Sequence, residues 1–149
     1  MTATGKKKNM RLISVTMGEE TADKRSADTL AMLDYGFNMY SIDTIVSKDN
    51  LLGNIKVNLG EEENVSIKIS NDINILNNNQ AGKRNITYEV NTYNVSAPVK
   101  VGDIVGKILV YEDGKYLFSE DITVVNDIDK ANIFKIFIRN LRDIFTLSI

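Results

Sequence analysis

The side chains that most often do chemistry are scarce in this chain of 149 residues. It contains no cysteine and no histidine, which removes disulfides, thiolate nucleophiles, imidazole bases and most zinc sites together. No serine is followed by a lysine three residues on, so that arrangement of a serine nucleophile with its base is missing as well. The residues alone therefore predict no catalytic group, no metal ligand and no cofactor in this chain.

Two runs of like charge are candidate binding sites. Glu61, Glu62 and Glu63 could bind calcium, but no spaced ladder of Asp or Asn accompanies them, so an acidic hairpin turn is the better interpretation. The three lysines at 6–8 lack interleaved aromatic residues and indicate a solvated turn. Because the net charge is -2, there is no broad positive field, and we predict no nucleic-acid partner.

The last stretch, residues 127–149, has the pattern of an amphipathic helix, with one broad apolar face and a basic face opposite. Such a helix can lie among lipid headgroups with its basic side chains near anionic lipid. A face this wide equally suits packing on the protein's own domain or in a partner groove, and the terminal position favours the membrane only slightly. The predicted membrane-contacting residues are Phe134, Lys135, Phe137, Arg139, Leu141, Arg142, Ile144 and Phe145.

The first forty residues read as a strand followed by a helix. Residues 9–17 form a short apolar, β-branched run after the lysine-rich turn, which predicts a strand. Residues 20–37 change to a helical period, with Thr21 as N-cap and Gly36 marking the end. The apolar stripe predicted for this helix consists of Ala22, Ser26, Leu30, Leu33 and Phe37.

From residue 40 onward, short alternating segments are separated by turn residues, which is typical of a small β-sandwich or barrel-like domain. A hairpin is expected across the acidic turn at 60–63, and a polar loop at 77–82. Turns are also expected at Gly102-Asp103 and Asp113-Gly114. The predicted strands are 55–59, 65–69, 73–76, 86–90, 104–111 and 116–125.

The string Ala-Pro-Val-Lys-Val-Gly-Asp-Ile-Val-Gly-Lys at 97–107 is the most distinctive in the chain. Pro98 stops one strand ladder, and Gly102-Asp103 turns the chain. Gly106 then allows a neighbouring segment to approach closely.

That string resembles a turn in the C-terminal β-domain of low-molecular-mass penicillin-binding proteins, the serine-type D-alanyl-D-alanine carboxypeptidases. Residues 2–4 with the turn and the segment 10–15 resemble the last strand of their catalytic domain. Ala27-Asp28 with the segment 33–37 resembles its closing helix. These parts occur in the family's order, followed by a β-domain and a terminal amphipathic helix, so the resemblance covers essentially the whole chain.

The resemblance implies a mainly β protein with three parts. Residues 1–39 would be an incomplete remnant of the α/β transpeptidase-like domain, 40–127 the all-β domain, and 128–149 an amphipathic membrane-anchor helix. The family trims the terminal D-Ala from peptidoglycan stem peptides through a serine acyl-enzyme. Its motifs Ser-x-x-Lys, Ser-x-Asn and Lys-Thr-Gly would all lie upstream of this chain. We therefore expect this piece to act as stalk and anchor and to be inactive alone.

The same resemblance implies an extracytoplasmic protein, peripheral on the outer face of the cytoplasmic membrane, although the start of this chain has no signal-peptide pattern. Peptidoglycan would be the partner of the missing catalytic part. A homodimer could form through an unpaired edge of the leader strand at 9–17. The alternative from another class is a free-standing module that binds the cell wall or another protein.

Overall fold

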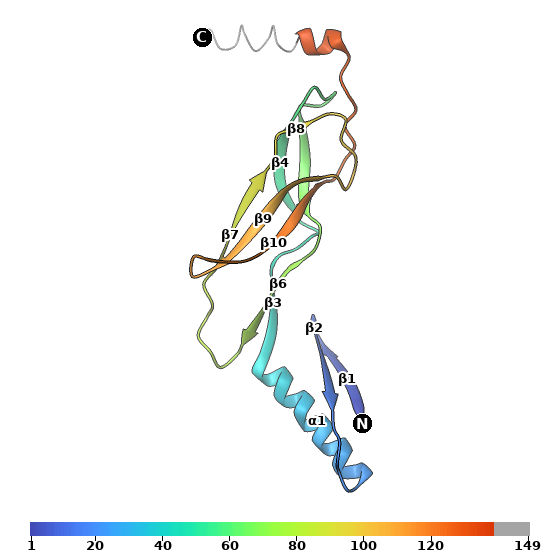
Figure 1. Ribbon diagram of the computed structural model, residues 1–149, viewed down its shortest axis with the longest axis vertical. Helices are drawn as coiled ribbons and strands as arrows, with labels where there is room; N and C mark the ends of the chain where they lie inside the picture. Colours follow the sequence, from blue (N-terminus) through green and yellow to red (C-terminus); the bar gives the residue numbers. More distant parts are fainter. Residues whose placement is uncertain (139–149) are drawn as a thin grey trace. The chain divides into compact units, whose positions relative to one another are not determined.

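The computed structural model describes residues 1–138. Its contacts divide the chain into two compact units, each of which takes two separate pieces of sequence. The first unit consists of Met1–Ile45 and Asn74–Arg84, and the second of Val46–Ile73 and the chain from Asn85 on. The colour gradient of Figure 1 lets both units be followed along the chain.

The first unit begins with an antiparallel hairpin of β1 (Thr2–Lys7) and β2 (Met10–Val15). The turn between the two strands lies at Lys8, whose φ is 52°. A turn is therefore confirmed at Lys8, whereas Lys6 and Lys7 of the predicted lysine turn lie on β1. The register runs from Thr2 opposite Val15 to Lys7 opposite Met10 without interruption. The leader strand is therefore paired along one edge by the residues that precede it.

Helix α1 (Ala22–Met39) packs on this hairpin. Its N-cap is Thr21, as predicted, because the Thr21 side chain accepts a hydrogen bond from the Lys24 N–H at 3.2 Å. The predicted end at Gly36 is wrong, since the helix continues to Met39. Gly36 instead serves packing: a Cβ there would lie 2.5 Å from Leu12 Cδ1.

The buried face of α1 differs from the predicted stripe in its first half. Ala22, Ser26 and Leu30 are exposed, whereas Thr29 is buried. The hydroxyls of Thr16 and Thr29 lie 2.9 Å apart, and Thr29 donates to the Arg25 carbonyl at 2.7 Å. A pattern based on apolar residues missed this contact because it is made by hydroxyl groups. Leu33 and Phe37 are half-buried, in line with the prediction.

A two-stranded sheet joins β3 (Tyr40–Val46) to β6 (Ile73–Asn78). Polar side chains bridge it on its exposed surface. Thr44 donates to the Asn74 side-chain oxygen at 2.7 Å, and the Asn77 amide donates to Asp43, also at 2.7 Å.

The second unit is a six-stranded sheet that curls into a half-barrel (Figure 1). Its strand order is β7-β9-β10-β5-β4-β8. All neighbours are antiparallel except β8, which runs parallel to β4. The strands are β4 (Leu51–Asn58), β5 (Asn64–Ile69), β7 (Ile86–Thr92), β8 (Val95–Ser96), β9 (Ile104–Glu112) and β10 (Lys115–Val124).

Alternating β-branched residues fill the inside of this curled sheet. Ile69, Ile108, Val110 and Ile122 have no exposed surface. The predicted β4–β5 and β9–β10 hairpins are both present, and Asp113-Gly114 forms the second turn with φ values of 49° and 77°. The prediction of a mainly β, barrel-like domain is confirmed.

Candidate functional site

A helical stretch at 133–138 ends the described part of the chain. Asn132 starts it, because its side-chain oxygen accepts a hydrogen bond from the Phe134 N–H at 2.7 Å and its carbonyl accepts one from the Lys135 N–H. The predicted start at Asp127 is wrong by six residues. Residues between Asp127 and Asn132 use their backbone groups to bond to the β-domain instead.

This helical stretch exposes large apolar side chains. Phe134 is 69% exposed and Phe137 is 59% exposed, and Ile133 and Ile138 are exposed beside them. At 100° per residue these four side chains share one face, and the exposed Lys135 lies outside it. Exposed apolar clusters are typical of surfaces that contact lipid or another apolar partner.

Three of the predicted membrane-contacting residues, Phe134, Lys135 and Phe137, therefore lie on the described helical stretch and reach solvent. The remaining five predicted residues lie outside the described part of the chain. They are Arg139, Leu141, Arg142, Ile144 and Phe145.

The segment that leads into the helix, residues 127–131, is fixed to two turns of the β-domain. Ile128 and Val99 exchange two backbone hydrogen bonds, both 2.9 Å long. The Ala131 N–H donates to the Leu59 carbonyl at 2.8 Å. Ile128 is 3% exposed and Ala131 is 6% exposed, so both side chains belong to the core. We call these five residues the exit segment.

Gly60 makes room for the exit segment. A Cβ on Gly60 would lie 2.8 Å from Ile128 Cγ2 and 2.7 Å from the Glu62 carbonyl oxygen. The latter is a backbone atom that cannot swing aside. A side chain at Gly60 would therefore force Ile128 or the backbone at Glu62 to shift.

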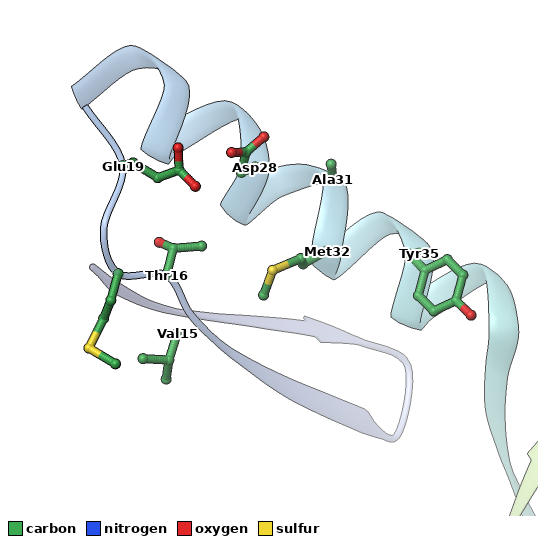
Figure 2. Close-up of a pocket in the computed structure, with 8 residues that line it drawn as sticks. Val15, Thr16, Glu19, Asp28, Ala31, Met32 and Tyr35 are labelled. Atoms are coloured by element: carbon green, nitrogen blue, oxygen red, sulfur yellow. The ribbon is translucent and has the colours of Figure 1, made fainter. Parts of the chain in front are cut away.

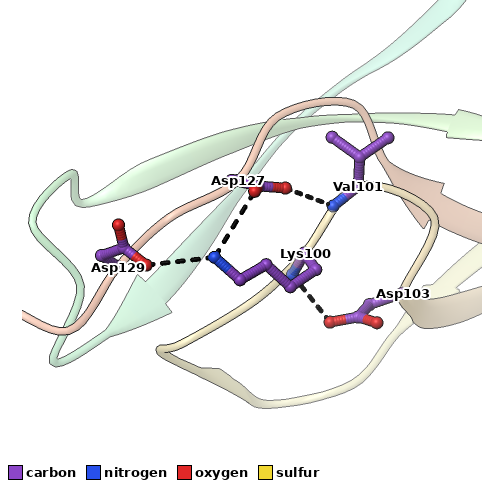
Figure 3. A network of polar contacts seen from close by, with 5 residues as sticks. All are labelled: Lys100, Val101, Asp103, Asp127 and Asp129. Carbon is purple, nitrogen blue, oxygen red and sulfur yellow. Dashed lines mark hydrogen bonds and ion pairs between the residues drawn. The ribbon is translucent and has the colours of Figure 1, made fainter.

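A network of charged side chains connects the exit segment to the turn at 100–103 (Figure 3). The Lys100 ammonium lies 3.4 Å from an Asp127 carboxylate oxygen and 3.2 Å from one of Asp129. The other Asp127 oxygen accepts a hydrogen bond from the Val101 N–H at 2.7 Å, and the Lys100 N–H donates to Asp103 at 2.8 Å. The network thus joins the turn at 100–103 to the exit segment.

This network shifts two pKa values in opposite directions. The hydrogen bond from the Val101 N–H, helped by the nearby Lys100, lowers the pKa of Asp127 below its usual 3.8. The hydrogen bond to Asp129 and the charge of Asp127 raise the pKa of Lys100 above its usual 10.5. Both groups therefore stay ionised through the neutral range. Sequence reasoning found the turn at Gly102-Asp103 but missed its charged partners, because they lie more than twenty residues further along the chain.

A concave surface lies within the first unit. Figure 2 shows side chains from the end of β2 and from α1 around a groove of about 760 Å³. Its acidic members are Glu19, which pairs with Lys24 at 3.5 Å, and Asp28. The other lining residues are Val15, Thr16, Met17, Ala31, Met32 and Tyr35. This lining has neither a lysine nor a serine, so the groove does not contain the serine–lysine pair of a serine acyl-enzyme.

Two properties of residues 1–138 bear on the kind of site. Within this range, no group of three or more Asp or Glu residues is placed to hold a metal ion. Over the same range, no helix combines the length and the apolar character needed to cross a bilayer.

Comparison with known proteins identifies the β-domain. The family model described as "Penicillin-binding protein 5, C-terminal domain" matches residues 40–130. The chain is 28% identical over 144 residues to the D-alanyl-D-alanine carboxypeptidase DacF of Bacillus subtilis (strain 168), covering 96% of this chain and 37% of that protein. It is 30% identical over 128 residues to DacA of Haemophilus influenzae, covering 85% of this chain and 32% of that carboxypeptidase.

A solved structure is similar over the same region. Penicillin-binding protein 5 from Haemophilus influenzae superposes with a TM-score of 0.63 at 26% identity, covering 87% of this chain and 38% of that one. The chain thus spans about a third of the length of the curated relatives it matches. With a family match over most of the chain and a shared fold, the chain belongs to the family of the penicillin-binding protein 5 C-terminal domain.

Proposed function

We propose that this chain is the stalk and membrane-docking part of a D-alanyl-D-alanine carboxypeptidase that trims the terminal D-Ala from peptidoglycan stem peptides. The terminal helix would lie on an anionic membrane surface, on the outer face of the cytoplasmic membrane. The observation that carries the proposal is the exposed pair Phe134 and Phe137 on a helix whose start is tied to the β-domain.

The attachment of the exit segment supports a stalk. Two backbone bonds between Val99 and Ile128 and one from Ala131 to Leu59 fix the point where the helix leaves the domain. Since Ile133 follows Ala131 by only two residues, the helix start stays within about 10 Å of Leu59. A helix held so close to a rigid sheet would transmit its position on the membrane to the whole β-domain.

Co-flotation with vesicles tests the docking. The chain should float with vesicles containing anionic lipid, and the double variant Phe134→Ser, Phe137→Ser should lose this binding because its apolar face no longer enters the headgroup layer. The matched control is Leu51→Ser with Leu76→Ser, which removes two side chains that are 61% and 53% exposed on β-strands. Binding unchanged in the first variant would assign the helix to protein packing.

Catalysis by this chain alone is a separate question. The parent enzyme would use a serine acyl-enzyme whose nucleophile lies in the part of the relatives that this chain does not match, so the 149-residue chain should not react with penicillin. A fluorescent penicillin tests this directly, with a complete carboxypeptidase as the positive control. A covalent label on this chain that survives denaturation would contradict the proposal.

A further inference from the structure

Strand β7 forms one border of the six-stranded sheet. Its seven residues pair with β9 in an unbroken register, from Ile86 opposite Glu112 to Thr92 opposite Gly106. None of the seven is buried, and Tyr88 and Val90 are 51% and 40% exposed. On its other side, no strand within residues 1–138 pairs with β7.

The backbone groups at this open border can be assigned. Asn85 accepts a hydrogen bond from the Asp113 N–H, and the Tyr93 N–H donates to the Val105 carbonyl, so both point toward β9. Because successive residues of a strand direct their N–H and C=O groups to opposite edges, the groups of Ile86, Tyr88 and Val90 point away from β9. This leaves a regular row of donors and acceptors along the open border.

Natural edge strands usually resist pairing through lysines, prolines or bulges. The hairpin of the first unit has such protection, with Lys6, Lys7 and Arg11 on its strands. Strand β7, with the sequence ITYEVNT, has none of these features, and its single charge is Glu89. Its apolar side chains Ile86, Tyr88 and Val90 also share one face, which the register aligns with the buried Val110 and Ile108 of β9.

We propose that β7 pairs with β7 of a second copy of this chain, antiparallel and centred on Tyr88. Tyr88 then lies opposite Tyr88 of the second copy, and Ile86 lies opposite its Val90. These residues carry the outward backbone groups, so each pair exchanges hydrogen bonds. The apolar row of one sheet continues directly into that of the other.

The charge pattern favours this register over the one centred on Glu89. Centring on Glu89 would set two like carboxylates directly opposite each other, which destabilises a strand pair. Centring on Tyr88 sets Glu89 opposite Thr87 of the second copy instead. Within its own chain Glu89 already accepts a hydrogen bond from the Tyr111 hydroxyl at 3.4 Å, on the same face of the sheet.

A single pair of short strands makes a small interface, below the size of stable complexes, so the dimer should be weak. Sedimentation equilibrium of the full chain from about 10 µM to about 1 mM should therefore show a reversible monomer–dimer equilibrium. Amide exchange adds a residue-level readout: protection of the Tyr88 and Val90 amides should rise with concentration.

Substitution of Thr87 tests the register, because Thr87 is exposed and faces Glu89 of the second copy twice in the symmetric dimer. Thr87→Lys creates two opposite-charge pairs and should tighten the dimer by about 2-fold to 30-fold, and Thr87→Glu should weaken it by a similar factor. Asn50→Lys and Asn50→Glu make the same charge changes at an exposed turn residue in the same unit and should leave association unchanged.

Three outcomes would overturn the proposal. One is a purely monomeric chain at about 1 mM, which would also result if β7 pairs only with a strand of a different protein. Another is association that shifts in the same direction in both Thr87 variants. The third is association that neither Thr87 variant affects, which would indicate another surface, such as the edge of the leader strand. Circular dichroism of each variant verifies that the monomer keeps its fold.

Discussion

Asp127 accepts a hydrogen bond from the backbone N–H of Val101 at 2.7 Å, across 26 positions of sequence. Through this bond, the Asp127 carboxylate at the start of the exit segment supplies a hydrogen-bond acceptor to the backbone of the turn at 100–103. Lys100 and Asp129 complete the contact at the surface. These four residues therefore add surface contacts to the attachment that the backbone bonds of Ile128 and Ala131 provide.

Acid should loosen this attachment. The pKa of Asp127 is lowered in the folded chain, so the unfolded chain binds more protons, and the free energy of unfolding falls as pH drops below 3.8 through the folded value. Asp127→Asn should be less stable at neutral pH and should flatten this part of the pH profile. Urea unfolding from about pH 2 to 7 measures both effects. A variant profile parallel to that of the unaltered chain would contradict the assignment.

Removing a core side chain should cost far more than removing an exposed one from the same sheet. Ile122 has no exposed surface and its backbone pairs with Ile69 and Gly106, so Ile122→Ala should lower the free energy of unfolding by about 2–5 kcal/mol. Ile104, which is 55% exposed on β9, is the control. Ile104→Ala should change stability by no more than about 0.5 kcal/mol. Equal losses would mean that the assigned inner face is wrong.

A side chain at Gly106 should destabilise the sheet. A Cβ there would lie 2.9 Å from Thr92 Cα and closer still to the Asn91 carbonyl oxygen, so β7 would have to move away from β9. Gly106→Ala should cost about 1–3 kcal/mol and speed amide exchange in β7. Gly82→Ala has no atom within 4 Å of its added Cβ and should be neutral or slightly stabilising. Similar exchange rates in the two variants would count against the close approach.

The N-cap of α1 offers a test in the first unit. Thr21→Ala removes the acceptor for the Lys24 N–H and should destabilise the helix by about 1 kcal/mol. Thr21→Asp keeps an acceptor and adds a negative charge near the helix N-terminus, so it should retain that stability. Amide exchange at Lys24 measures the effect. An unchanged rate in the alanine variant would show that another group caps the helix.

The sequence predicts the local features well, because they depend on neighbouring residues. Alternation defines the β4–β5 and β9–β10 hairpins, and the turn chemistry of Asp113-Gly114 sets where the second one reverses. Thr21 identifies the start of α1 in the same way. Such signals lie within a few residues of the structure that they determine.

The errors arise where a distant segment decides the outcome. Gly36 looks like a helix terminator, but the side chain of Leu12 in β2 needs the space that it leaves. The terminal helix starts late because Val99 and Leu59 bind the backbone of the exit segment, which no helical periodicity reveals. Likewise the alternation at 86–90 predicts the strand but not its place in the sheet, where Tyr88 and Val90 are exposed because the strand lies at the border.

The burial of Ile128 sets a limit on truncation. A chain cut at Asn126 to remove the apolar helix would also lose the partner of Val99 and the side chain that fills the space beside Gly60. A chain ending at Asn132 would keep both and would remove the exposed helical stretch at 133–138 together with the residues after it. The shortest form of this domain that keeps its core intact therefore ends after Ala131, beyond the end of its last strand, β10.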